Sequence, residues 1–178
     1  MIQYPLREIE ITRMRESDLE QVDAIEKISY PSPWPESAFA SELSKERTCY
    51  YLVAKHGEQV AGYSGMWVML DEGHVTTLAV HPEFRRQRIA SRLLLQNFDE
   101  AYRRNLHCLT LEVRITNEAA KSMYQKFGLQ KRGYRKGYYL DNNEDAEIWT
   151  SPYLHIPEYQ EFIRRMKESI LNPEENIL

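Results

Sequence analysis

The stretch that decides the fold is "HVTTLAVHPEFRRQRIASRLL", residues 74–94. Its first seven residues predict a strand, since β-branched and apolar side chains dominate them. After the arginine-rich turn, an apolar stripe predicts a helix to about Arg104, formed by Ile89, Leu93, Leu94, Phe98, Ala101 and Tyr102. A helix that starts directly after a strand presents unpaired N–H groups and a partial positive charge. The turn "RRQRIA", residues 85–90, is therefore a candidate anion site, although a solvated basic helix start explains the arginines equally well.

The segments after this helix continue an α/β pattern. "CLTLEV", residues 108–113, is typical of a buried strand, and "NEAAKSMYQKFG", residues 117–128, of a helix that Gly128 ends. A strand, a helix and a second strand in this order form a right-handed crossover between parallel strands. Residues 131–140 and 146–151 predict two further strands joined by a turn.

The segments before the stretch predict a strand, two helices and two more strands. "EIEITRM", residues 8–14, alternates like a half-buried strand, and residues 17–28 follow as a helix with Ser17 as its N-cap. The apolar positions of this helix are Leu19, Val22, Ile25 and Ile28. The proline-rich loop "YPSPWPESAF" precedes a short helix, and such loops often carry recognition. Residues 48–54 and 59–70 then predict antiparallel strands.

The last periodic segment, "EYQEFIRRMKESIL", is residues 158–171. It predicts an amphipathic helix with one apolar side, which consists of Tyr159, Phe162, Ile163, Met166 and Ile170. This helix is expected to lie on the core or on a partner. The chain is thus expected to form one domain, residues 1–151, with a C-terminal helical extension, residues 152–178.

Composition argues against several classes of protein. The chain has 178 residues, 42% of them hydrophobic, which is enough for one globular domain with a pocket. The start "MIQYPLREIE" lacks the features of a targeting signal, and the longest apolar run, "MWVML", is too short to cross a membrane. We therefore expect a cytoplasmic protein without a membrane partner. A net charge of -4 argues against direct nucleic-acid binding, and the isolated Cys49 and Cys108 are expected to be reduced core thiols.

Several motifs in this order resemble the GNAT superfamily of acetyl-CoA-dependent N-acetyltransferases, over about residues 8–151. These motifs are "HVTTLAV", "RRQRIA", "LTLEV" and "NEAAKSMYQKFGL". More narrowly, "PWPESAF", "LEVRITNEAAKSMYQKFG" and "GYY" are similar to the RimI group, the bacterial ribosomal-protein N-terminal alanine acetyltransferases. The resemblance implies an α/β (α+β) GNAT fold, whose mixed, mostly antiparallel sheet is splayed at the cofactor site and flanked by helices.

The family's pyrophosphate loop has the pattern Q/R-x-x-G-x-G/A, and Arg85 and Ala90 match its ends. Arg88 replaces the central glycine, where a Cβ costs about 1 to 2 kcal/mol if the dihedral is left-handed and little if it is helical. The Arg88 guanidinium could offset this cost by a charge-assisted bond to a CoA phosphate. The resemblance implies cofactor contacts by Leu78, Ala79, Val80, Arg85, Arg86, Gln87, Arg88, Ile89, Ala90, Ser91 and Asn117. For Asn117, a plain helix cap is an equal alternative.

Glu112 is the candidate general base for acetyl transfer, a reaction that needs a neutral amine and a proton for the departing thiolate. It shares one face of its strand with Thr110, in a central parallel strand whose two faces are normally covered. Burial there is expected to raise the pKa of Glu112 towards neutrality. The alternative is a strand-end glutamate paired with Arg114 or a lysine. The RimI-like enzymes carry their catalytic glutamate at the matching position.

The resemblance also assigns the general acid to Tyr124, although the residue alone is more typical of a core aromatic. Likewise, it implies a substrate side walled by Trp34, Tyr138 and Tyr139, which could equally be packing residues. His74 stands where many relatives have an acidic residue, and we expect it to be structural.

Together these expectations describe an N-terminal acetyltransferase with acetyl-CoA as co-substrate and no metal. The resemblance implies the N-terminal alanine of ribosomal small-subunit protein eighteen, or a similar peptide, as acceptor. An α-amine, with a pKa near 8, suits a modest base better than a lysine amine, whose pKa is near 10.4. Two alternatives stay open: a GNAT enzyme for a small-molecule amine, and a non-catalytic acyl-CoA-binding or ribosome-associated module.

Overall fold

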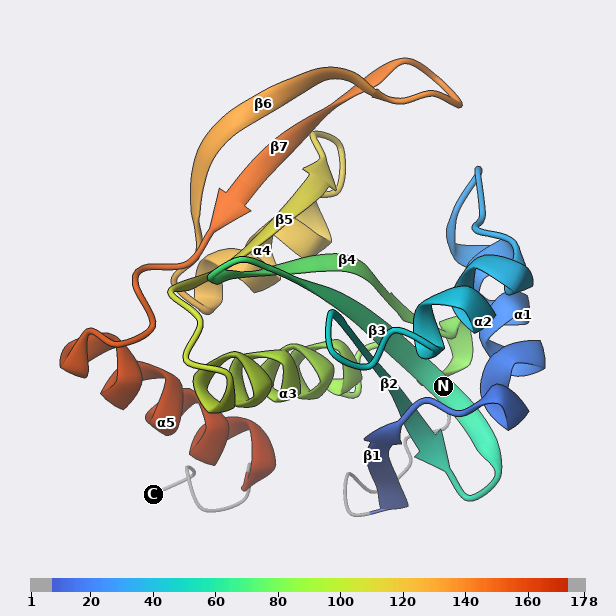
Figure 1. Cartoon of the computed structure of the whole chain (residues 1–178), viewed down its shortest axis with the longest axis horizontal. Helices are drawn as coiled ribbons and strands as arrows, with labels where there is room; N and C mark the ends of the chain where they lie inside the picture. Colours follow the sequence, from blue (N-terminus) through green and yellow to red (C-terminus); the bar gives the residue numbers. More distant parts are fainter. Residues whose placement is uncertain (1–7, 173–178) are drawn as a thin grey trace. The chain divides into compact units, whose positions relative to one another are not determined.

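The computed structural model describes residues 8–172, which form a seven-stranded sheet and five α-helices (Figure 1). The strands are β1 (Ile9–Arg13), β2 (Cys49–His56), β3 (Gln59–Met69), β4 (Glu72–Val80), β5 (Cys108–Arg114), β6 (Gln130–Tyr139) and β7 (Glu144–Thr150). The helices are α1 (Leu19–Ser29), α2 (Glu36–Leu43), α3 (Ile89–Arg103), α4 (Glu118–Lys126) and α5 (Pro157–Leu171).

The strand order of the sheet is β1-β2-β3-β4-β5-β7-β6. Strands β4 and β5 pair in parallel, whereas the pairs β1–β2, β2–β3, β5–β7 and β6–β7 are antiparallel. The predicted mixed, mostly antiparallel α/β fold is therefore confirmed.

The chain divides into two compact units, Met1–Val68 with Thr76–Gln96 and Met69–Val75 with Asn97–Leu178. The predicted division into residues 1–151 and 152–178 stays a prediction. The end of the predicted C-terminal extension, residues 173–178, lies outside the described part of the chain.

Helix α1, in the first unit, begins at Leu19 and not directly after Ser17. A single 3-10 turn, Glu16–Asp18, precedes it, and the Asp18 carboxylate accepts a hydrogen bond from the Arg15 N–H at 2.9 Å. The prediction of Ser17 as the N-cap was therefore wrong. The aspartate beside it closes the turn because its carboxylate reaches back to a free main-chain donor.

The buried face of α1 also differs from the prediction at one position. Leu19, Val22 and Ile25 are buried, but Ile28 is 53% exposed. At about 100° per residue, nine residues carry Ile28 to the opposite side of the helix from Leu19. Seven residues bring Glu26 back close to the direction of Leu19, and Glu26 is buried instead.

Aromatic packing joins α2 to the neighbouring strands of the first unit. The Phe39 ring meets Tyr51 of β2 and Tyr63 of β3 edge-on, with ring centroids 6.1 and 5.7 Å apart. In the β2–β3 register Tyr51 faces Gly65, where a Cβ would lie 2.3 Å from the Tyr51 ring. Gly65 is therefore needed to let this tyrosine lie against its partner strand.

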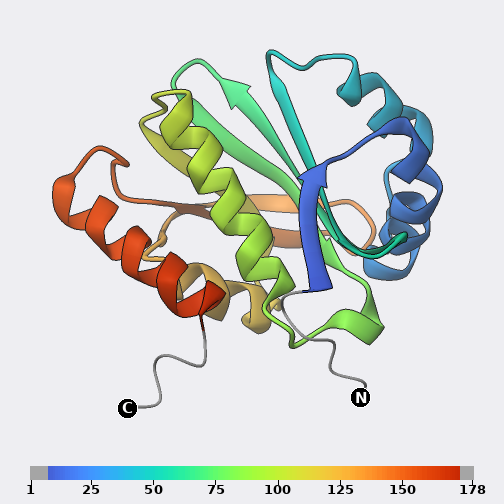
Figure 2. The same cartoon turned by 90° about the horizontal axis from the view of Figure 1, so that it is seen from below.

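In the second unit, α5 lies alongside the C-terminal part of α3 (Figure 2). Phe98 of α3 stacks on Phe127 with ring centroids 5.9 Å apart, and Tyr159 of α5 meets Phe98 edge-on. The Tyr159 hydroxyl donates to the Phe127 carbonyl at 2.8 Å. The predicted amphipathic helix is confirmed, although Phe162, at its edge, is exposed. The turn after α4 ends at Gly128, whose φ of +78° favours glycine.

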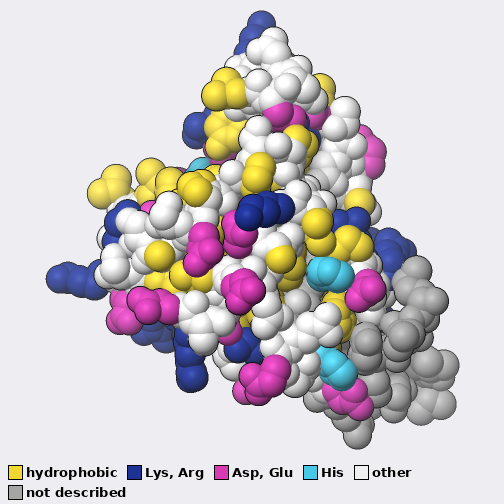
Figure 3. Space-filling model, turned by 90° about the vertical axis from the view of Figure 1, so that its right-hand side faces the viewer, with side chains coloured by type: hydrophobic (Ala, Val, Ile, Leu, Met, Phe, Trp, Pro, Cys, Tyr) yellow, Lys and Arg dark blue, Asp and Glu magenta, His cyan; other side chains and the backbone are white. Residues whose placement is uncertain are grey.

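Cys49 and Cys108 are both buried and carry free thiols, as predicted. None of the helices in the range 8–172 combines the length and apolar character that a membrane crossing requires. On the face shown in Figure 3, acidic and basic side chains of the described residues are interspersed with hydrophobic ones.

Candidate active site

The arginine-rich turn lies in the first unit, between β4 and the start of α3. Arg86 and Arg88 adopt left-handed conformations, with φ of +65° and +58°. The Arg88 carbonyl accepts the Arg92 N–H at 3.0 Å, so the first turn of α3 starts at this residue. The N–H groups that begin α3 have no partner within the helix. The turn thus offers a helix N-terminus with nearby arginines, an arrangement that suits a phosphate.

The sequence left open whether a Cβ at position 88 is costly, because the cost depends on the dihedral angle. The left-handed conformation of Arg88 shows that the larger cost applies. We expect Arg88→Gly to raise the free energy of unfolding by about 1 kcal/mol, because relief of strain outweighs the greater freedom of glycine in the unfolded chain. The affinity for acetyl-CoA should fall several-fold, since the guanidinium is lost. Urea unfolding and titration calorimetry measure the two effects.

Arg88→Ala is the matched control, because it removes the guanidinium but keeps a Cβ in the left-handed conformation. It should lower the affinity without the gain in stability. Much tighter binding of acetyl-CoA by Arg88→Gly would show instead that the arginine impairs the loop.

The end of β4 supplies main-chain groups next to this turn. The Leu78 carbonyl accepts a hydrogen bond from the Tyr30 hydroxyl at 3.0 Å, and the Val80 carbonyl accepts one from Arg85 Nε at 3.2 Å. The Ala79 side chain is buried. Both carbonyls therefore already have a partner within the protein, and their contact with a cofactor stays a prediction.

In the second unit, Glu112 forms close polar contacts with two residues from other strands, a histidine and an arginine. Its Oε2 lies 2.7 Å from His74 Nε2 of β4, and its Oε1 lies 3.0 Å from a guanidinium nitrogen of Arg135 of β6. The Glu112 side chain is only 4% exposed, compared with 18% for His74 and 52% for Arg135. The carboxylate is therefore enclosed, while both of its partners reach solvent.

These partners overturn the predicted direction of the Glu112 pKa. Burial alone would raise it, but the hydrogen bond and charge of His74, together with the Arg135 charge, lower the pKa below its usual value. Glu112 is consequently ionised at neutral pH. The sequence did not predict the contact of His74 with the candidate base, and the structural role expected for His74 stays a prediction.

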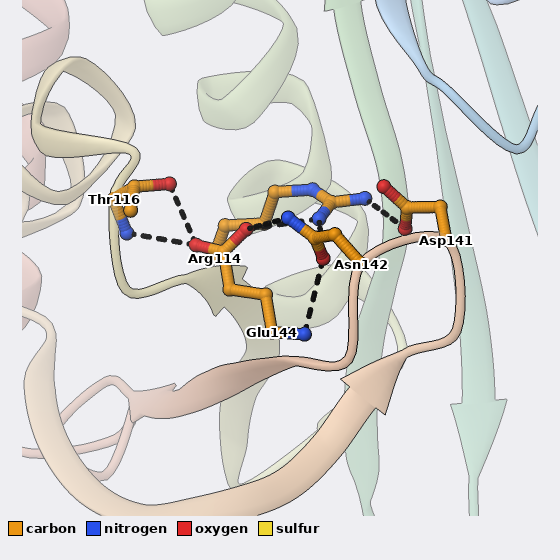
Figure 4. Close-up of polar contacts among 5 residues, drawn as sticks. All are labelled: Arg114, Thr116, Asp141, Asn142 and Glu144. Atoms are coloured by element: carbon orange, nitrogen blue, oxygen red, sulfur yellow. Dashed lines mark hydrogen bonds and ion pairs between the residues drawn. The ribbon is translucent and has the colours of Figure 1, made fainter.

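The alternative pairing of Glu112 with Arg114 is not found, because the Arg114 side chain bonds to the β6–β7 turn (Figure 4). Its guanidinium lies 2.7 Å from Asp141 and 2.9 Å from Glu144. Glu144 also accepts the Thr116 hydroxyl at 2.6 Å, and Thr116 and Arg114 together lower the pKa of Glu144 to about 2. This network ties the end of β5 to the hairpin that carries the predicted substrate-side tyrosines.

The two tyrosines of this hairpin differ in their surroundings. The Arg114 guanidinium covers the Tyr139 ring, 3.9 Å from its centroid, and Tyr138 meets Tyr139 edge-on at 5.1 Å. Tyr138 is exposed whereas Tyr139 is half-buried, so Tyr138 is the more accessible of the two tyrosines, and their role on the substrate side stays a prediction. Although the side chain as a whole is exposed, partial desolvation of the Tyr138 hydroxyl and the charge of Glu112 raise the pKa of Tyr138.

Tyr124 belongs to α4 and Asn117 lies at its start, as predicted. Tyr124 is the buried residue of this helix. Asn117 is the N-cap, and its side-chain oxygen accepts the Ala120 N–H at 3.1 Å. The cap alternative for Asn117 is thus correct, and its contact with a cofactor stays a prediction.

Trp34 lies in the first unit, in the loop between α1 and α2. Its ring packs against Phe39 and Trp67, with centroids 5.8 and 6.1 Å apart. Its main-chain N–H donates to the buried Glu26 carboxylate at 2.9 Å. Sequence reasoning missed Glu26, although its spacing of seven residues from Leu19 could have placed it on the buried face of α1.

The structure thus collects the predicted cofactor residues of β4 and the turn, with Trp34, in one unit, and Glu112, Asn117, Tyr124, Tyr138 and Tyr139 in the other. Among residues 8–172, no group of three or more His, Cys, Asp or Glu side chains could hold a metal ion.

The sequence model of the Acetyltransferase (GNAT) family matches residues 19–129. The chain therefore belongs to the GNAT family and is an N-acetyltransferase, of a class that takes its acetyl group from acetyl-CoA. It is 38% identical to a Bacillus subtilis protein provisionally named ribosomal protein bS18-alanine N-acetyltransferase, over 78% of this chain and 91% of that protein. It is 33% identical to the Escherichia coli K12 ribosomal protein bS18-alanine N-acetyltransferase, over 80% and 96% of the two chains.

A solved structure agrees with this classification. The crystal structure of the Escherichia coli ribosomal-protein-S18-alanine N-acetyltransferase is similar with a TM-score of 0.74 and 31% identity, and the match covers 82% of this chain and 94% of that one. The predicted family and fold are therefore confirmed.

Proposed function

We propose that this enzyme acetylates the N-terminal alanine of ribosomal small-subunit protein bS18 in the cytoplasm, with acetyl-CoA as donor. The similarity to the Bacillus subtilis and Escherichia coli proteins of that printed name carries the proposal, because it extends over 91% and 96% of their lengths. The free N-terminus suits the chemistry, since an α-amine with a pKa near 8 is partly neutral at pH 7.

The donor is assigned to the first unit. The helix start and the arginines of the turn fit a pyrophosphate, and the main chain of Leu78, Ala79 and Val80 ends β4, one 3-10 turn, Pro82–Phe84, before it. Asn117 is assigned as a further contact from α4. Trp34, Tyr138 and Tyr139 are assigned to binding of the acceptor peptide. Their rings are apolar, and each carries a hydroxyl or N–H group that can form a hydrogen bond.

The chemistry is assigned to Glu112 and Tyr124. Glu112 takes a proton from the amine nitrogen as that nitrogen bonds to the acetyl carbonyl carbon, and His74, 2.7 Å from Glu112 Oε2, holds the carboxylate in place. Tyr124 gives its phenolic proton to the sulfur as the carbon–sulfur bond breaks. The products are the acetylated amine and the free thiol of CoA, and both residues regain their starting states by exchange with water.

The acceptor is tested by mass spectrometry of peptides incubated with acetyl-CoA and the enzyme. An Ala-starting peptide with the bS18 N-terminal sequence should be acetylated on its α-amine. A Ser-starting peptide should react more slowly, and a lysine peptide with a blocked N-terminus should not react.

Acetylation of the blocked lysine peptide at the same rate would contradict α-amine selectivity. If small amines react while every peptide stays unmodified, the enzyme acts on a small molecule. Binding of CoA without any turnover would favour the non-catalytic module.

A further inference from the structure

Glu26 is a buried carboxyl group that the proposed chemistry does not use. It lies on the apolar face of α1 and is only 2% exposed. Its Oε1 accepts the Trp34 N–H at 2.9 Å, and its Oε2 accepts the hydroxyl of Tyr63 from β3. Both carboxyl oxygens therefore hold groups from outside the helix.

The chain of hydrogen bonds continues from Tyr63 to strand β4. The Thr77 hydroxyl oxygen lies 3.4 Å from the hydroxyls of both Tyr63 and Tyr30. The Tyr30 hydroxyl donates in turn to the Leu78 carbonyl at 3.0 Å. The Thr77 hydroxyl has one proton and donates it to one of the two tyrosines at a time, so the path from the Trp34 loop reaches β4 at Thr77, next to Leu78, entirely within the first unit.

We propose that Glu26 is a positioning residue for acetyl transfer, which fixes the loop at Trp34 relative to the main chain of β4 at Leu78. This inference rests on the proposed function, which assigns Trp34 to the acceptor and Leu78 to acetyl-CoA. An apolar residue at this point of α1 would extend the core of Leu19 and Val22 without the cost of burying a carboxyl group. The hydrogen bonds that Glu26 accepts from the Trp34 N–H and the Tyr63 hydroxyl explain why a carboxyl group stands at this buried position.

The charge of Glu26 controls how firmly it holds the loop. Burial raises the pKa of Glu26 to about 7, the Trp34 N–H lowers it, and the Asp23 carboxylate raises it. The titratable and charged groups around it are the Asp23–Lys27 ion pair on the same helix and the phenols of Tyr30 and Tyr63. An ionised carboxylate accepts a stronger hydrogen bond than a neutral acid. The Trp34 loop is therefore held most firmly above pH 7.

The direct test follows the Trp34 amide by NMR from about pH 5 to 9, a range that spans the titration of a carboxyl group with a pKa near 7. In the wild-type protein its proton shift should change with a midpoint near 7. Glu26→Gln should hold this amide at the wild-type low-pH position throughout. Glu20→Gln, an exposed change on the same helix, should titrate like the wild type. A Trp34 amide that does not titrate in the wild type would overturn the inference.

The kinetic test uses the Ala-starting peptide at pH 8. Glu26→Gln should raise the KM for the peptide by about tenfold, comparable with the loss of one charge-assisted hydrogen bond, and leave kcat nearly unchanged. An unchanged KM would count against the inference. If no peptide is acetylated by the wild type, the proposed function fails, while the NMR titration still decides whether Glu26 holds the loop.

Stability separates positioning from a purely structural role. Because folding raises the pKa, Glu26 contributes stability at low pH that is lost as the pH rises through about 7. Glu26→Gln should therefore melt at a higher temperature than the wild type at pH 8 and at about the same temperature near pH 5. A variant that is more stable yet binds peptide less tightly supports positioning, whereas a parallel loss of both refutes it.

Discussion

Replacing Glu112 with glutamine is expected to lower kcat/KM for an Ala-starting peptide by about 10²- to 10⁴-fold, the usual contribution of a general base. Glutamine has nearly the same shape as glutamate but cannot accept the proton. The loss should fall mainly on kcat, because the enclosed carboxylate is only 4% exposed and has little surface with which to bind substrate. Steady-state kinetics with mass-spectrometric detection measures the effect.

Glu118→Gln is the control for this change, since Glu118 is an exposed carboxylate at the start of α4. It should retain wild-type activity, and circular dichroism should show both variants folded. Near-normal turnover by a folded Glu112→Gln protein would remove Glu112 from the chemistry and leave it as a partner that orients His74.

The lowered pKa of Glu112 also predicts the pH dependence. With its pKa below the usual value, Glu112 stays ionised from neutral pH down to acidic pH. The rise of kcat/KM with pH around neutrality should therefore follow the amine of the peptide, with an apparent pKa near 8 for an α-amine. Any stability that the contacts of ionised Glu112 with His74 and Arg135 provide is present above the unfolded pKa of Glu112 and is lost only as the pH falls through the lowered value.

Replacing Tyr124 with phenylalanine is expected to lower kcat by about 10²-fold at pH 7, within the range of general acid catalysis. The ring remains in its buried place on α4, so the change removes a proton donor without opening a cavity. The loss should shrink as the pH rises above about 8.5, because a thiolate with an ordinary pKa then leaves without being protonated.

The melting temperature and the KM for acetyl-CoA serve as checks on Tyr124→Phe. Both should stay near the wild-type values if the hydroxyl acts only on the leaving group. Undiminished turnover at pH 7 would exclude the acid role and make Tyr124 a core aromatic.

The local chemistry of the chain determined most of the elements. The apolar stripe after the arginine-rich turn predicted α3, and the alternation of residues 108–113 predicted β5. Gly128, with φ of +78°, lies in the turn that ends α4. Each of these signals lies within one helix or strand or at its end. The spacing of apolar residues and the turn residues are therefore sufficient to predict that element. The order of the same motifs along the chain was enough to identify the family.

The prediction of Ser17 as an N-cap and of Ile28 as a core residue failed at the ends of one helix. A short 3-10 turn moved the start of α1 to Leu19. The accumulated rotation then exposed Ile28 and buried Glu26, because a repeat of three residues falls behind the 3.6-residue turn. The helical spacing from Leu19 already favoured position 26 over position 28 as the buried one. The prediction failed because it assumed that the apolar residues alone mark the buried face.

The charge state of the candidate base could not be predicted in the same way. The sequence placed Glu112 in a buried strand and so indicated a raised pKa, whereas His74 from β4 and Arg135 from β6 lower it. The strain at Arg88 likewise depended on a dihedral angle that the family pattern left open. The sequence by itself determined the elements, the family and the candidate residues, because these follow from neighbours along the chain. Only the tertiary structure decided which charges surround Glu112 and Glu26, because electrostatic interactions depend on distance in space and these partners come from other strands and loops.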